Sequence, residues 1–140
     1  MLNQVILVGR TTRNVELREA SNGQAFGIVT IAATRSFKNP ETDTYDTDFI
    51  DVSLWGITAE NVAKYAGKGS AISIRGRVAN RILDFPGEQT FKTIGIIGEQ
   101  VSFIQTKTPS TDEINEEKSN EFMLDDLPTN KEFDEEIGKL

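Results

Sequence analysis

Apolar and polar residues alternate along several short segments of the first hundred residues, and a period of two predicts β-strands. The clearest segment, 49–55, separates aliphatic residues from aromatic and polar ones: Ile50, Val52 and Leu54 against Phe49, Asp51, Ser53 and Trp55. Residues 71–79 alternate in the same way, with Ile72 and Ile74 opposite Arg75 and Arg77. Three further segments, 4–8, 25–34 and 91–104, are apolar and rich in Val, Ile or Thr. Together these patterns predict five strands.

Turn and helix signals separate the strands. Asn22-Gly23 is typical of a tight hairpin, Asn39-Pro40 opens a loop to about residue 46, and Pro86-Gly87 marks another turn. Thr58 is a plausible N-cap for a short helix that Gly67 and Gly69 end. Five strands with one helix between the third and the fourth is the OB arrangement, so we expect an all-β, five-stranded OB-fold barrel.

Charge divides the chain into two parts. Residues 1–107 carry twelve Lys and Arg against eleven Asp and Glu, a net charge of +1. Residues 108–140 carry three against eleven, a net charge of −8, and few apolar side chains. Such a segment buries too little surface to offset its ordering entropy, so we expect an OB-fold domain at 1–107 and a disordered acidic tail at 108–140. The alternative for the tail is a short amphipathic helix at 130–139.

The residue types present exclude several kinds of catalytic and metal-binding site. The chain has no Cys and no His, which excludes disulfides, Cys/His zinc sites and Ser-His or Cys-His catalysis. Gly67-Lys68-Gly69-Ser70 follows the predicted helix, whereas a phosphate-binding loop precedes one, so it is interpreted as a helix stop. The Asp-rich loop around Asp43 and Asp46 lacks the spacing of a calcium loop. We therefore expect no enzyme, no cofactor and no metal.

The start of the chain has neither a basic region nor an apolar signal segment, and no apolar run reaches membrane-spanning length. A cytoplasmic location without membrane contact is the default expectation.

Aromatic residues on a polar strand face suggest a surface on which bases stack. In a small barrel the aliphatic face of segment 49–55 fills the core, which leaves Phe49 and Trp55 on the outer face, with Phe37 at the end of the previous strand. The alternative is that Phe49 or Trp55 packs under the helix or in a subunit interface. Cations follow the aromatics, as a groove that tracks a phosphate backbone requires: Arg10, Arg35, Lys38, Arg75, Arg77 and Arg81.

Several motifs, in one order, resemble bacterial single-stranded DNA-binding proteins over about residues 1–106. They are Met1 to Arg10, Val15 to Arg18 followed by Asn22-Gly23, Phe49 to Gly56, Ala59 to Ala63, Lys68 to Ser70, and Gly76 to Val78. The resemblance implies an OB-fold homotetramer that coats single-stranded DNA in replication, recombination and repair. It also implies stacking roles for Phe37, Phe49 and Trp55 and backbone contacts for the six cations. The divergence suggests a phage or mobile-element version, in a bacterial cytoplasm or nucleoid.

Two departures from the family stand out. Members of the family usually have an aromatic residue in the hairpin after Arg81, at the position that corresponds to Leu83 in this chain. Phe85 is the candidate substitute for that aromatic residue. The family's tail commonly ends in an acidic cluster followed by Pro-Phe, which docks replication and repair proteins. The similar cluster here is internal, and Phe133 offers a second acidic-aromatic peptide. The candidate partner motif is therefore Asp125, Asp126, Leu127, Pro128 and Phe133.

Two rival functions stay open at this point. The first is an OB-fold protein-interaction or primosome module with weak DNA binding. The absence of an aromatic residue at Leu83 favours it slightly. An OB-fold nuclease needs clustered carboxylates beside a cation at a metal site, a constellation that the sequence does not offer.

Overall fold

The computed structural model describes residues 1–83, 87 and 90–109. The predicted acidic tail from residue 110 on, with its partner motif, and Phe85 lie outside the described residues. Within the described ranges the elements are, in chain order, β1 (Val5–Thr11), β2 (Arg18–Glu19), β3 (Ala25–Lys38), β4 (Tyr45–Trp55), α1 (Gly56–Tyr65), β5 (Ala71–Leu83) and β6 (Phe91–Gln105).

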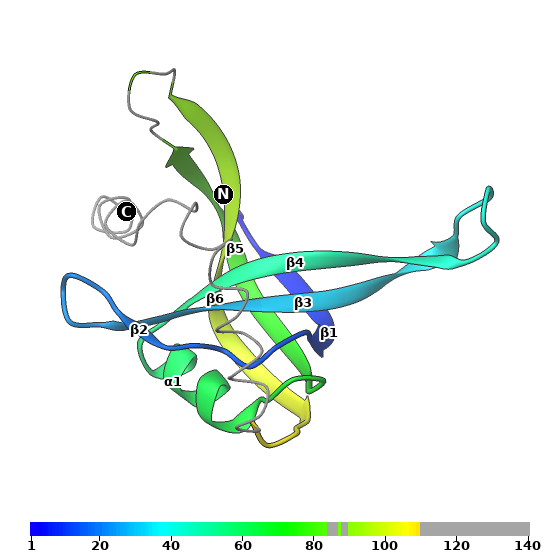
Figure 1. The fold of residues 1–140 in the computed structure, drawn as a ribbon. Helices are drawn as coiled ribbons and strands as arrows, with labels where there is room; N and C mark the ends of the chain where they lie inside the picture. The colour runs from blue at the N-terminus through cyan, green and yellow to red at the C-terminus, as the bar shows by residue number, and fades with distance from the viewer. Residues whose placement is uncertain (84–86, 88–89, 110–140) are drawn as a thin grey trace.

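The strands form one sheet in the order β1-β5-β6-β4-β3-β2, and a further pairing of β1 with β3 closes it into a barrel (Figure 1). The two-residue strand β2 only pairs with the start of β3, through a hairpin turn at Gly23, whose φ is 81°. The barrel therefore has five strands, β1, β3, β4, β5 and β6. Because α1 joins the third and fourth of these, the predicted OB-fold barrel with one helix is confirmed.

Long antiparallel ladders and short seams build the barrel. β3 pairs with β4, and β5 pairs with both β1 and β6, along most of their lengths. The pairing of β4 with β6 is parallel and rests on Val52–Ile96 and Ser53–Ile97. The pairing of β1 with β3 rests on Arg10–Ala32 and Thr11–Ile31. Two sheet halves, β3–β4 and β1–β5–β6, thus meet at two short seams.

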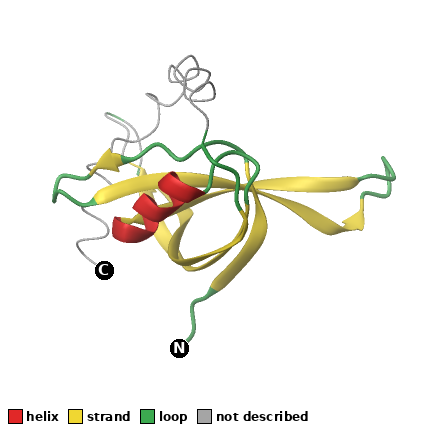
Figure 2. Cartoon of the chain, turned by 90° about the horizontal axis from the view of Figure 1, so that it is seen from below, coloured by secondary structure: helices red, strands yellow, loops and turns green. Residues whose placement is uncertain are grey.

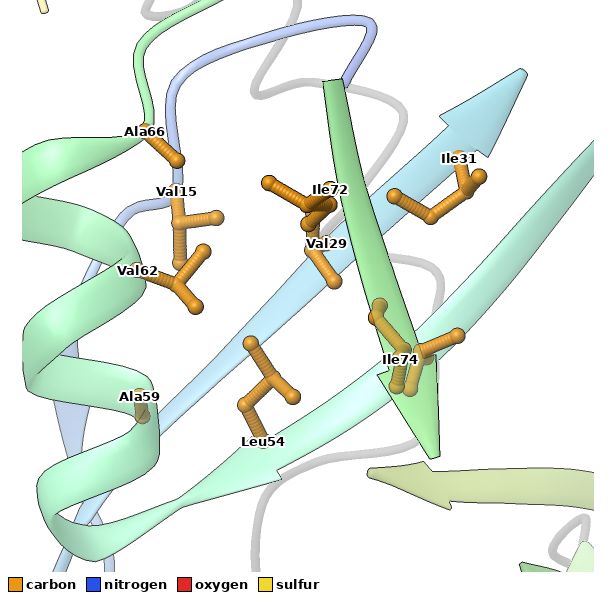
Figure 3. Close-up of a cluster of buried hydrophobic side chains, with 10 residues drawn as sticks. Val15, Val29, Ile31, Leu54, Ala59, Val62, Ala66, Ile72 and Ile74 are labelled. Carbon is orange, nitrogen blue, oxygen red and sulfur yellow. The ribbon is translucent and has the colours of Figure 1, made fainter. Parts of the chain in front are cut away.

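Aliphatic side chains from both halves fill the barrel, and α1 covers one end of it (Figures 2 and 3). The alternation seen in the sequence explains this core, because every second residue of a strand points inward. The buried side chains are Val29, Ile31, Val52, Leu54, Ile72 and Ile74 from the strands, with Val15, Ala59, Val62 and Ala66. Ser53 departs from the predicted exposed face and is buried, although its register places it on the outward face between Ile28 of β3 and Ile97 of β6.

The start of α1 also differs from the prediction. Thr58 is not the N-cap: Trp55 takes that place with extended backbone and makes no side-chain capping bond. Gly56 follows with φ at 58°, a left-handed conformation that glycine adopts at little cost. The strand therefore turns directly into the helix three residues earlier than the cap signal indicated.

The glycine-rich segment after α1 is a structural loop. The backbone N–H of Gly67 donates to the carbonyl of Lys107, and the Thr11 hydroxyl donates to the carbonyl of Gly67. The buried Ser70 hydroxyl donates to Gly67 and accepts from the N–H of Lys107 at 2.8 Å. The loop thus ties β1 to the end of the barrel domain and has no phosphate-binding geometry at a helix start.

Two hairpins extend beyond the barrel, β3–β4 in one direction and β5–β6 in another (Figure 1). β3 continues four residues past the predicted end at Thr34, and β5 continues four past Ala79. From Thr34 outward the β3 side of its hairpin is exposed, so hydrophobic alternation could not mark it.

Candidate nucleic-acid interface

The outward face of the β3–β4 half carries two of the predicted stacking residues. Since Ile50, Val52 and Leu54 point to the core, alternation places Phe49 and Trp55 on the outside. Phe49 is 69% exposed and lies across the ladder from Ala32, a small residue that leaves the ring uncovered. Its ring can therefore accept a base from solvent.

Phe37 lies farther out, near the tip of the β3–β4 hairpin. It is 65% exposed and follows an irregularity in the ladder between Thr34 and Lys38. No ring contact is recorded between Phe37 and Phe49 in the described part of the chain. The two rings are separate exposed platforms, as successive bases of a flexible strand would require.

Trp55 is half-buried. It is therefore neither the fully exposed stacking residue nor the fully packed residue that the sequence left as alternatives. Its ring packs on Phe26 with a centroid distance of 4.5 Å, and its indole N–H is shielded without an acceptor among the described residues. The sequence analysis did not anticipate Phe26, the buried register partner of Trp55, as the residue that supports the indole ring. Its own position in the alternation of β3 is the signal that would have placed both rings on one face.

The predicted phosphate contact of Arg35 competes with an ion pair. The Arg35 guanidinium donates through Nε and Nη2 to the two carboxylate oxygens of Asp48, at 3.0 and 2.8 Å. Asp46 lies 3.7 Å away on the same guanidinium. The hydrogen bonds from Arg35 hold the pKa of Asp48 below its ordinary value, and the same bonds raise the pKa of Arg35. The charge of Arg35 is largely neutralised within the hairpin.

Asp48→Asn is expected to release Arg35 for a phosphate, because the two charge-assisted hydrogen bonds from the guanidinium to the carboxylate are lost. Each added phosphate contact on a single strand steepens the slope of log K against log salt by about 0.7. Titrations of oligo-dT across a salt series measure this slope. Glu41→Gln, the same charge change in the same hairpin, is the control, and equal slopes for the two variants would refute the release.

The ion pair between Arg35 and Asp48 weakens in one direction of pH only. Because the pKa of Asp48 is lowered on folding, the ion pair is present at neutral pH and is lost only as the pH falls through that lowered pKa, below the ordinary 3.8. Binding assays near neutral pH therefore sample Asp48 as the ionised carboxylate that pairs with Arg35.

The other predicted cations are spread over the barrel. Arg10 donates to the carbonyl of Gly69 at 2.9 Å, and Lys38 pairs with Asp43 at 3.4 Å. Arg77 lies 3.8 Å from Glu99, while Arg75 is exposed across from Ile6 of β1. Arg81 is half-buried on the β5–β6 hairpin. Together with Arg35, these five cations come from three strands, β1, β3 and β5, and their roles toward a phosphate backbone stay predictions.

The described residues hold no group of three or more Asp or Glu side chains suited to a metal ion. Nor does any helix among them have the length and apolarity to cross a membrane.

A closed five-stranded barrel with one helix between its third and fourth strands is the OB fold, and exposed aromatics on its outer face are typical of OB folds that bind single-stranded nucleic acid. The single-strand binding protein family matches residues 2–104. The chain therefore belongs to the single-strand binding protein family, whose members are DNA-binding proteins and not enzymes. The predicted family, non-enzymatic character and single-stranded DNA binding are confirmed at this level.

Three bacterial relatives illustrate the match. Single-stranded DNA-binding protein B of Bacillus subtilis is 37% identical over 107 residues, which cover 76% of this chain and 94% of the relative. The single-stranded DNA-binding protein of Oceanobacillus iheyensis is 37% identical over 107 residues, 76% of this chain and 66% of the relative. That of Halalkalibacterium halodurans is 41% identical over 108 residues, 76% of this chain and 63% of the relative. The match thus spans less than two thirds of the last two proteins.

Proposed function

We propose that this protein binds single-stranded DNA independently of sequence and wraps it over the outward face of the barrel. The exposure of Phe37 and Phe49 on a barrel of this family is the observation that carries the proposal. Stacking on a ring needs no particular base, since every base has a π-face. Lysine and arginine side chains along the hairpins supply phosphate contacts, Lys38, Arg75, Arg77 and Arg81 among them.

Titration with oligo-dT while Trp55 fluorescence is followed tests the function. Trp55 is the only tryptophan, so the signal has one source. Oligo-dT is expected to quench it, because Trp55 lies on the same strand face as Phe49, and duplex of equal length is expected to leave it unchanged. If neither quenching nor a gel shift with oligo-dT occurs, the protein-interaction module becomes the better account.

Assembly with further copies of the chain is the second part of the proposal. Ile6 and Val8 project outward from β1 and are exposed. In the described part of the chain, β1 pairs with β5 on one side but with β3 only from Arg10, so on the β3 side the edge from Val5 to Gly9 pairs with no strand. An unpaired edge with apolar outward side chains invites strand addition. We expect the β1 strands of two chains to pair across a two-fold axis within the homotetramer. This pairing would give the free backbone N–H and C=O groups of the edge hydrogen-bond partners.

The remaining roles follow from membership of the family. We infer a role in DNA replication, recombination and repair within the bacterial cytoplasm, in a host or a phage. The acidic segment 108–140, with Asp125, Asp126, Leu127, Pro128 and Phe133, is proposed as the contact for replication and repair proteins.

A further inference from the structure

A residue ahead of β1 holds the base of the β5–β6 hairpin through two hydrogen bonds. The side-chain amide of Asn3 donates through Nδ2 to the carbonyl of Val78 at 2.7 Å. Its Oδ1 accepts from the backbone N–H of Val78 at 2.9 Å. One carboxamide thus satisfies both backbone groups of a residue that lies 75 positions further along the chain. Asn3 therefore takes the place that a paired strand residue would hold.

This contact begins where the ladder between β1 and β5 ends. The last register pair of that ladder is Val5–Gly76, whereas β5 and β6 continue as a hairpin to Leu83, past the start of β1 (Figure 1). In the described part of the chain, no strand pairs with this edge of β5 beyond Gly76. The hydrogen bonds of Asn3 therefore join the segment before β1 to the first part of the hairpin that β1 itself does not reach.

A β-bulge lies at the base of the hairpin, next to this contact. Opposite Gly76 the register of β6 slips by one residue, and Glu99 is the extra residue. Such a bulge bends the strand and increases its twist. A Cβ on Gly76 would collide with the carbonyl oxygen of Ile97, so the two strands approach closely here. Val78 is the second residue beyond Gly76, so Asn3 holds the backbone directly outside the bulge.

Arg77 lies between the bulge and Val78, and it is one of the predicted phosphate contacts. Its register partner is Ile97, so it alternates with Val78, whose partner Ile96 packs against the core. The side chain of Arg77 therefore projects to the outward face of the barrel. Glu99 lies 3.8 Å from it, and because both side chains are partly exposed, this pair is weak enough for a phosphate to displace.

We propose that Asn3 is a positioning residue for DNA binding: its side-chain amide sets the direction in which the β5–β6 hairpin leaves the barrel and so holds Arg77 on the path of the DNA backbone. Two hydrogen bonds to one residue fix the orientation of its backbone as well as its distance. Asn3 acts through the hairpin and needs no contact with the DNA. Because the contact is exposed, its loss frees the hairpin without opening the core. This inference rests on the proposed function, since Arg77 contacts the same strand of DNA.

Asn3→Ala is expected to weaken oligo-dT binding by roughly 3- to 10-fold, because a freed hairpin spends only part of its time in the direction that binds. The slope of log K against log salt is expected to fall by up to about 0.7, the contribution of one phosphate contact on a single strand. Gln4→Ala removes the neighbouring side-chain amide, for which no hydrogen bond is recorded within the described residues, and is expected to bind normally. Circular dichroism and solution mass confirm that each variant is folded and assembled.

A double-mutant cycle separates positioning from a general loss of stability. Arg77→Gln removes the side chain that Asn3 is proposed to position. In this background Asn3→Ala is expected to change the affinity by less than about twofold, because the two residues act on one contact. An equal loss of affinity in both backgrounds would show that Asn3 does not act through Arg77.

Spin labels read the direction of the hairpin itself. The chain has no Cys, so cysteines introduced by Thr93→Cys on the hairpin and Ile57→Cys on α1 are the only labelled sites. With labelled chains diluted in unlabelled ones, Asn3→Ala is expected to broaden the distance distribution between the labels and Gln4→Ala to leave it unchanged. If the unchanged protein binds oligo-dT but Asn3→Ala lacks either the weaker binding or the broader distribution, the positioning role is refuted and the function stands. If the unchanged protein does not bind oligo-dT, the proposed function itself fails.

Discussion

The double variant Phe37→Ala, Phe49→Ala is expected to bind oligo-dT at least about 30-fold more weakly than the unchanged protein. Each lost platform costs roughly 1–3 kcal/mol in proteins of this class, so two cost at least about 2 kcal/mol. Both rings are exposed and no ring contact between them is recorded, so their removal disturbs little of the core. Equilibrium titration at fixed salt measures the loss.

The salt dependence tells stacking from electrostatics in this variant. Removal of two neutral rings is expected to leave the slope of log K against log salt unchanged, because no phosphate contact is lost. Ile57→Ala, an exposed apolar residue on α1, is the control and is expected to bind normally. An affinity within twofold of the unchanged protein would contradict the assignment of both rings.

The double variant Ile6→Glu, Val8→Glu is expected to split the tetramer at the β1 pairing into smaller species, dimers of the 15.5 kDa chain where a second interface holds. Carboxylates on the outward face of two adjacent β1 strands repel one another and lose the apolar contact. Binding of long single strands is then expected to fall by about 10²–10⁴-fold, because linked sites no longer act together. A short oligonucleotide that occupies one barrel is expected to bind almost as before.

Sedimentation or light scattering gives the mass, and titration with short and long oligo-dT gives the two affinities. Ile57→Glu adds a carboxylate at an equally exposed position, 68% against 65% for Ile6, and is expected to leave the assembly intact. Assembly that survives both changes on β1 would exclude this edge as the interface.

The barrel could be predicted from the sequence because one face of each strand is buried. Segments 49–55 and 71–79 alternate so regularly that their strands and inward faces follow directly. The outer ends of β3 and β5 could not be predicted, since beyond the barrel neither face of a hairpin need be apolar. The early start of α1 was missed because the glycine conformation at Gly56, rather than a capping side chain, sets it.

The candidate site was predictable only in part, for a related reason. Exposure of Phe49 follows from alternation along β4, whereas Phe37 lies on the outer part of β3 that alternation could not mark. The pairing of Arg35 with Asp48 and the contact of Asn3 with Val78 depend on the register between strands, which spacing along the chain does not reveal. Charge along the chain therefore did not reveal that Arg35 is paired within the hairpin, and its role as a phosphate contact stays a prediction.

The β4–β6 seam gives the barrel a further property. Within the described residues, the two register pairs Val52–Ile96 and Ser53–Ile97 join the sheet halves there, so few backbone bonds hold this seam. On the proposed path, a strand of DNA that runs from the β3–β4 hairpin past Phe49 would cross this seam from outside. Bound nucleic acid is then expected to hold the two sheet halves together. It should slow amide hydrogen exchange along the seam and raise the melting temperature of the barrel through binding alone.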